Sequence, residues 1–166
     1  MIGLGDENGK FVLKEVAGNL MASWIDKVSD ETDRKTYDIQ LEKLDNLNIG
    51  DISFIKIDVE GFEFEVLRGA TETLSRKMPV ILFEQHTNDF ANGTSPSISY
   101  LQNFGYKICW VEGGRTLSGS WLRQGFEMIS GFIFGSKLAM ISGEPVPPRT
   151  HSFLLAIPVT LKLKNR

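Results

Sequence analysis

Two short segments in the N-terminal third of the chain alternate apolar with polar residues. They are residues 11–16 (FVLKEV) and 37–41 (YDIQL), and alternation of this kind predicts half-buried strands. The charge-rich residues 27–35 have no apolar face and are expected to form a solvated loop. Residues 3–6 (GLGD) look like part of a glycine-rich nucleotide loop. No buried strand comes before them, however, so we interpret them as a turn.

The pattern between residues 54 and 83 predicts a strand–helix–strand unit. Residues 54–57 form a short, mostly apolar run, and residues 80–83 (VILF) form a continuous one, which is typical of a strand buried on both faces. Between them the apolar residues recur with the period of a helix, which Pro79 ends. These helical positions are Phe62, Val66, Leu67, Ala70 and Leu74. A helix of this length between two strands favours a right-handed parallel crossover.

The C-terminal half continues the alternation of helices and strands. We expect a helix over residues 97–104, a strand over 106–111, a helix over 121–134 and a last strand over 153–158. Helices interleaved with strands in this order predict an α/β fold built on a mainly parallel sheet.

Composition places the chain among ordinary globular proteins. Hydrophobic residues make up 42% and charged residues 23% of the 166 residues, which is sufficient for one folded domain. We divide this single domain into a lead-in segment (residues 1–50), a core (51–111) and a C-terminal extension (112–166). The formal net charge of −3 predicts no binding of nucleic acid.

Cysteine usage and targeting signals indicate where the protein resides. The single cysteine, Cys109, can form neither an internal disulfide nor a zinc site, so we predict no metal and a reduced, cytoplasmic location. The first ten residues lack the basic and apolar regions of a signal peptide. The longest largely apolar stretch, residues 153–161, contains Pro158 and is too short for a membrane span.

Acidic residues and a histidine follow the two core strands. Asp58 and Glu60 come after the first strand, and Glu84 and His86 come after the second. Because ligands bind at the carboxyl ends of parallel strands, we expect these four side chains to lie along one rim. Such groups can orient a hydroxyl, accept its proton or hold a divalent cation.

Each of these residues also has a structural interpretation. Asp58 could cap the N-terminus of the helix, and Glu60 could interact with the helix dipole. His86 taken alone is more typical of a loop histidine than of a catalytic base. Gly61 fits a tight entry from strand into helix. Gly69 costs about 1 kcal/mol relative to alanine inside a helix, so it predicts close packing of the helix against the sheet.

Three segments of the core carry a family signature. They are residues 54–63 (FIKIDVEGFE), 65–70 (EVLRGA) and 79–84 (PVILFE), and residues 43–45 (KLD) precede them. In order and spacing they resemble the FkbM family of S-adenosylmethionine-dependent methyltransferases, with Lys43 in place of the threonine of the family's Thr-Leu-Asp element. The resemblance implies a Rossmann-like class I methyltransferase sheet, of which the chain holds the later strands.

The resemblance also implies a reaction. It points to transfer of a methyl group from S-adenosylmethionine to a hydroxyl of a sugar or another biosynthetic intermediate, either a small molecule or a glycan. Asp58, Glu60, Glu84 and His86 would orient or deprotonate the acceptor, and Asp58 and Gly61 would contact the cofactor. The family's glycine-rich cofactor loop would precede the first residue. We therefore expect a truncated, C-terminal part of such an enzyme that binds the cofactor weakly.

Two other functions compete with methyl transfer. In a truncated fold the strand over residues 54–58 has a bare edge unless residues 11–16 or 37–41 cover it, and a bare edge invites pairing with a second chain. The chain would then be an interaction module or a homo-oligomer that uses this edge and residues 121–134. A metal-binding hydrolase built on the three acidic residues is the weaker alternative, since no histidine-rich ligand set accompanies them.

Overall fold

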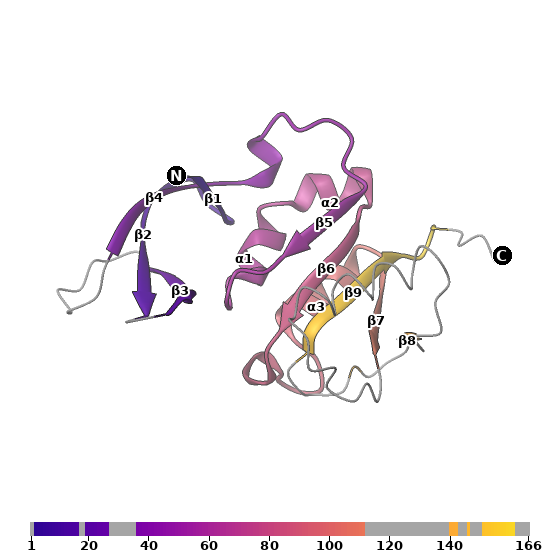
Figure 1. Ribbon diagram of the computed structural model, residues 1–166. Helices are drawn as coiled ribbons and strands as arrows, with labels where there is room; N and C mark the ends of the chain where they lie inside the picture. The colour runs from indigo at the N-terminus through magenta and orange to yellow at the C-terminus, as the bar shows by residue number, and fades with distance from the viewer. Residues whose placement is uncertain are drawn as a thin grey trace. The chain divides into compact units, whose positions relative to one another are not determined.

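The computed structural model describes residues 2–16, 19–26, 36–111, 140–142, 146 and 151–161. The chain divides into two compact units, and each contains one β-sheet (Figure 1). Unit 1 comprises Met1–Ser53 and Ile57–Met78, and unit 2 comprises Phe54–Lys56 and Pro79–Arg166. The proposed division into a lead-in segment, a core and an extension stays a prediction.

The sheet of unit 1 has four strands in the order β1-β4-β2-β3. They are β1 (Ile2–Leu4), β2 (Gly9–Val16), β3 (Asn19–Asp26) and β4 (Thr36–Glu42). The two alternating segments of the sequence form β2 and β4, as predicted, and they pair antiparallel with Phe11 opposite Ile39. Phe11, Ile39 and Leu41 form the buried apolar cluster of this sheet, because residues two apart on a strand share a face.

The first strand corrects an expectation. Residues 2–4 form β1, which pairs parallel to β4 with Ile2 opposite Gln40, so the predicted turn does not begin at residue 3. Backbone hydrogen bonds hold this strand, and its glycine lets it lie close to its neighbour. A Cβ on Gly3 would come within 2.8 Å of the Leu41 side chain. A strand of three residues is too short to show alternation, which explains the wrong prediction.

The helical part of unit 1 is divided in two. A 3-10 turn, η1 (Leu44–Asn46), comes first. It is followed by two helices, α1 (Glu63–Arg68) and α2 (Thr71–Lys77). The sequence predicts a single helix from Phe62 to the residue before Pro79. The predicted apolar face is nevertheless correct, since its helical members are buried. These members are Val66, Leu67, Ala70 and Leu74.

The break between α1 and α2 lies at Gly69, where the chain touches the end of β1. A Cβ on Gly69 would come within 1.9 Å of the Gly5 carbonyl oxygen, so only glycine fits without a shift of the backbone. The neighbouring Arg68 pairs with Asp6 at 3.1 Å. Close packing is thus found at Gly69, but the partner is the loop after β1 and not the sheet that the sequence predicts.

Asp45 in η1 caps the second helix. Its carboxylate accepts hydrogen bonds from the backbone N–H groups of Glu72 (2.8 Å) and Thr73 (2.9 Å) and from the Thr73 hydroxyl (2.8 Å). Its own backbone N–H donates to the Gly69 carbonyl at 3.1 Å. This satisfies N–H groups that have no partner within a helix. The aspartate of the KLD segment therefore has a structural role in unit 1.

The sheet of unit 2 has five strands in the order β5-β6-β9-β7-β8. They are β5 (Phe54–Ile57), β6 (Val80–Gln85), β7 (Tyr106–Val111), β8 (Met140–Ser142) and β9 (His151–Pro158). β5 and β6 run in the same direction in Figure 1, whereas β9 is antiparallel to β6 and β7. The helix α3 (Pro96–Asn103) packs against β7.

Continuous apolar runs make the centre of this sheet. In β6 the side chains of Ile81, Leu82 and Phe83 are all buried, and in β9 the run from Leu154 to Ile157 is buried as well. Burial of successive residues means that both faces of the strand are covered, as the sequence predicts for residues 80–83. The strands expected over 106–111 and 153–158 and the helix expected over 97–104 are confirmed as β7, β9 and α3.

Within the described residues β5 is an edge strand. Neither β2 nor β4 covers it, because both pair within the sheet of unit 1. Lys56, which is unusual in an apolar strand, is exposed on this edge strand, as expected for a charge that discourages edge pairing. The predicted loop over 27–35 and helix over 121–134 lie outside the described residues.

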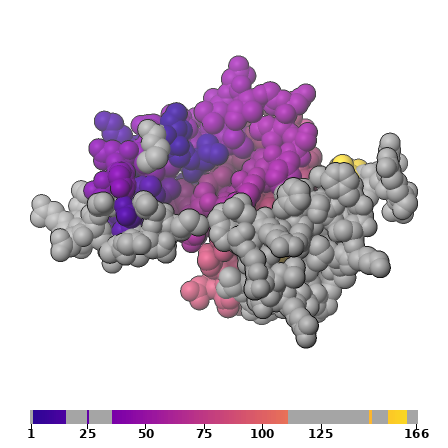
Figure 2. Space-filling view, in the orientation of Figure 1, coloured from indigo at the N-terminus to yellow at the C-terminus, as the bar shows by residue number. Residues whose placement is uncertain are grey.

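The connection between η1 and β5 lies at the surface of unit 1, in the purple part of Figure 2. Asn48, Ile49 and Gly50 are exposed. Lys77 donates a hydrogen bond to the Asp51 carboxylate and holds the pKa of Asp51 below its usual range.

None of the described helices is long and apolar enough to span a bilayer.

Candidate functional site

The loop between β5 and α1 has an uncommon backbone. Glu60 has a φ of 50° and Gly61 a φ of 91°, both in the left-handed region that favours glycine. No atom of the described residues lies within 4 Å of the position of a Cβ on Gly61, so conformation rather than space requires glycine there. The tight strand-to-helix entry predicted at Gly61 is confirmed. A glutamate held in this region costs of order 1 kcal/mol, which is typical of functional loops.

The carboxylate of Glu63 holds this loop in place. Glu63 is 4% exposed and accepts hydrogen bonds from the backbone N–H groups of Val59 at 3.2 Å and Gly61 at 3.3 Å. A carboxylate that accepts two backbone hydrogen bonds is well compensated for its burial. Sequence analysis did not single out Glu63. The signal was an acidic residue two positions after the glycine of a strand-to-helix turn.

The helix-cap interpretation of Asp58 is wrong. The N-cap position of α1 is Phe62, and no side chain caps it. Asp58 is half-buried in the loop, and Glu60 is exposed at its tip. Both acidic side chains therefore belong to the loop and not to the first turn of α1, whose acidic residues are Glu63 and Glu65.

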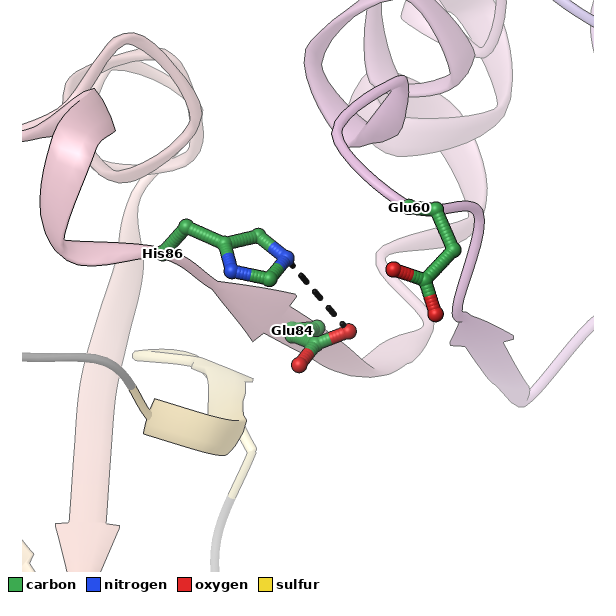
Figure 3. A group of neighbouring side chains, drawn as sticks. All are labelled: Glu60, Glu84 and His86. Atoms are coloured by element: carbon green, nitrogen blue, oxygen red, sulfur yellow. Dashed lines mark ion pairs between the residues drawn. The ribbon is translucent and has the colours of Figure 1, made fainter. Parts of the chain in front are cut away.

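Glu84 and His86 form a pair at the end of β6. The His86 Nε2 atom lies 3.7 Å from the Glu84 Oε2 atom, with side-chain exposures of 35% and 18%. Figure 3 shows the imidazole ring turned toward this carboxylate. The register between β6 and β9 shifts between Phe83 and Gln85, so Glu84 sits at an irregularity of the ladder. Such irregularities often re-aim side chains next to active sites.

Gln85 ties down the segment that follows. Its amide Nε2 donates to Asp89 Oδ2 at 2.8 Å and to the His86 carbonyl at 3.3 Å. Its Oε1 accepts from the Ser95 hydroxyl, and Ser95 in turn caps α3 by accepting from the Ile98 N–H at 3.2 Å. The connection from β6 to α3, which includes η2 (Thr87–Asp89), is thus hydrogen-bonded to the Gln85 side chain near both of its ends.

The chain is similar to one known protein family. A family model described as the methyltransferase FkbM domain matches residues 3–108. The chain belongs to the FkbM methyltransferase family. No curated protein and no solved structure matches it at a significant level. The resemblance seen in the sequence is confirmed, and the matched range runs from β1 into β7.

Three residues of the FkbM signature have structural roles. Asp45 caps α2, Glu63 holds the loop after β5, and Gly69 permits the contact with Gly5. The signature also contains the predicted site residues Asp58 and Glu60, which belong to unit 1, and Glu84, which belongs to unit 2. That Asp58, Glu60, Gly61, Glu84 and His86 act in one site stays a prediction.

Two polar groups and a thiol are buried around β7. Among the described residues, the Tyr106 hydroxyl and the Trp110 Nε1 have no hydrogen-bond partner. Burial raises the pKa of Tyr106, and it raises the pKa of Cys109 against a smaller opposite effect of Lys107. A thiol with a raised pKa is a poor nucleophile. Cys109 is therefore excluded from the candidate catalytic residues.

Proposed function

We propose that the protein transfers a methyl group from S-adenosylmethionine to a hydroxyl of a sugar or another hydroxylated biosynthetic intermediate, on a Rossmann-like methyltransferase fold. The match of residues 3–108 to the FkbM domain carries this proposal. We assign the reacting side chains to the loops after β5 and β6, which contain the site residues that the sequence predicts.

The loop after β5 suits the cofactor chemically. S-adenosylmethionine, when bound, supplies an electrophilic methyl group on a positively charged sulfur. Asp58 and Glu60 offer carboxylates that accept hydrogen bonds from amino and ribose hydroxyl groups. The space beside Gly61 is open at its Cβ position, so a ligand can approach the backbone there. We assign Asp58 and Gly61 to the cofactor, and Glu60 to orienting the reacting groups.

The loop after β6 suits the acceptor. His86 in its neutral form takes the proton of the acceptor hydroxyl as the oxygen forms its bond to the methyl carbon and the carbon–sulfur bond breaks. The imidazolium that results is stabilised by the Glu84 carboxylate, whose Oε2 lies 3.7 Å from Nε2. General base catalysis of this kind contributes typically 10²–10⁴-fold to a rate. Alignment of the two reactants supplies the remainder.

Radiolabelled methyl transfer tests the proposal. The chain is incubated with a panel of hydroxylated sugars and small molecules and with S-adenosylmethionine labelled in its methyl group, at a concentration high enough to offset the weak binding that the sequence predicts. Labelled ether products are counted. E84Q and H86N should lower transfer at least tenfold, whereas E72Q, at an exposed carboxylate on α2, should leave it unchanged. Absence of transfer to any hydroxyl, or full activity of both E84Q and H86N, would falsify the proposal.

The edge strand β5 supports a second candidate function, an interaction module that pairs with another chain. Neither β2 nor β4 joins β5 in the sheet of unit 2, and Phe54 on it is exposed. Light scattering after size exclusion discriminates this candidate. A concentration-dependent dimer that I55P or I57P dissolves would favour it, and a monomer at all concentrations would eliminate it.

A further inference from the structure

Gln85 is a buried residue that lies, along the chain, between Glu84 and His86, the two residues assigned to the acceptor. Gln85 is 2% exposed and is the last residue of β6, with Glu84 before it and His86 after it. The polar atoms of the Gln85 side chain are hydrogen-bonded to His86, Asp89 and Ser95. We therefore look for its role in the groups that it holds and not in contact with the substrate.

The backbone of His86 is fixed from two directions. Its N–H donates to Asp89 Oδ2 at 3.2 Å, and its carbonyl accepts from Gln85 Nε2 at 3.3 Å. The same Asp89 oxygen accepts from Gln85 Nε2 at 2.8 Å. The Asp89 carboxylate thus holds the peptide N–H of His86, the Gln85 amide holds the His86 carbonyl, and the amide and the carboxylate are bonded to each other. The Asp89 backbone N–H also contacts the His86 carbonyl at 3.2 Å and the His86 side chain, so Gln85 and Asp89 together constrain the direction in which the His86 ring leaves the chain.

The other end of the loop is fixed by the same side chain. Gln85 Oε1 accepts from the Ser95 hydroxyl, and Ser95 caps α3. The amide of Gln85 donates to Asp89 and accepts from Ser95 at the same time, which neither a carboxylate nor an apolar side chain can do. An ionised glutamate would face Asp89 with a like charge, and methionine would fill the space with no polar group. Neither substitution would therefore preserve both hydrogen bonds of Gln85.

We propose that Gln85 is a positioning residue, which holds the loop of residues 86–95 so that the His86 ring stands beside the Glu84 carboxylate. The inference rests on the proposed function, in which this pair takes the proton of the acceptor hydroxyl. It assigns a role to a buried residue that touches neither the substrate nor the cofactor.

A double-mutant cycle read by NMR tests the inference without any activity measurement. The chain has two histidines, so the ring signals of His86 are readily assigned by comparison with H86N. At one fixed pH, E84Q should displace the His86 ring signals, because the carboxylate lies 3.7 Å away. In a Q85M background the same E84Q change should displace them by less than half as much.

Two further variants keep the test decisive. D89A, at an exposed residue, removes the oxygen shared by Gln85 and His86 and should reduce the displacement in the same way. Q40M makes the same chemical change in unit 1, where Gln40 donates to the Leu41 carbonyl, and should leave the displacement unchanged. A displacement that stays full in both Q85M and D89A overturns the inference, as does an E84Q change that moves no His86 signal.

The outcome is separable from that of the proposed function. If the cycle behaves as expected but no hydroxyl is methylated, Gln85 still positions the pair and the assigned reaction is wrong. If methyl transfer is found but the cycle shows no dependence on Gln85, the reaction stands and the positioning role is wrong.

Discussion

Substitution of Gly69 by alanine perturbs a close backbone contact of unit 1. The added Cβ would lie 1.9 Å from the Gly5 carbonyl oxygen and 2.8 Å from its carbon, where ordinary contact begins at 3.4 Å. Both atoms belong to the backbone, so no side-chain rotation relieves the clash. The junction of α1 and α2 must separate from the loop after β1.

Opposing contributions set the size of the effect. Overpacking that moves a backbone costs about 1–3 kcal/mol, and this site lies at the upper end. The shift also endangers the Asp45 N–H bond to the Gly69 carbonyl, which contributes about 1 kcal/mol. Against this, Gly69 has φ −72° and ψ −6°, which alanine adopts readily and with a gain of about 0.4–1 kcal/mol. The net loss expected is about 3 kcal/mol.

Thermal and urea denaturation measure this loss. For a chain of this length about 3 kcal/mol lowers the melting temperature by roughly 6–12 °C. G50A is the matched control, because nothing lies within 4 Å of a Cβ at Gly50, and it should raise stability by about 0.4–1 kcal/mol. A G69A variant as stable as the native chain would refute the contact, and an equal loss in G50A would refute the reasoning from space.

Three further results are expected. D45A should lower the free energy of unfolding by about 1 kcal/mol, because Glu72 and Thr73 lose their cap; an unchanged urea midpoint would contradict this. Y106F should raise stability by roughly 1 kcal/mol, since it removes a buried hydroxyl that lacks a partner among the described residues; a loss in calorimetry would mean that the hydroxyl is bonded. The folded state raises the pKa of Cys109, so its contribution to stability is full below the ordinary thiol pKa, about 8.5, and declines as the pH rises above it. C109A should therefore show a shallower loss of stability at alkaline pH, and parallel curves for the two proteins would refute this cause.

The elements that the sequence predicts are those in which burial follows a simple pattern. The run over residues 80–83 became β6, because a strand covered on both faces needs apolar side chains at every position. Alternation found β2 and β4 for the related reason that one face of each is buried. Pro96 and Gly105 bracket the helix that became α3, since their local preferences agree with the fold.

The elements that the sequence did not predict depend on partners distant along the chain. β1 has an exposed Ile2 and is held by backbone pairing to β4, which leaves no mark in its own residues. The division of one predicted helix into α1 and α2 depends on the Gly5 carbonyl. A local pattern shows that Gly69 is unusual in a helix, but it does not show what approaches it.

The same limit applies to the candidate site. Asp58, Glu60, Glu84 and His86 stand out because charged residues that follow apolar strands are conspicuous. Glu63 and Gln85 are buried and work by hydrogen bonds to backbone and side chains. Their sequence context resembles that of ordinary surface residues, so geometry was needed to identify them.

The carboxylate of Glu63 has a consequence for anyone who redesigns the strand-to-helix connection. Residues 58–61 take their shape from an acceptor that belongs to the following helix, so the connection is not a self-contained fragment. A graft of the DVEG tetrapeptide onto another scaffold that leaves Glu63 behind would forfeit the left-handed turn at Glu60 and Gly61. The smallest transferable cassette extends from Asp58 through Glu63.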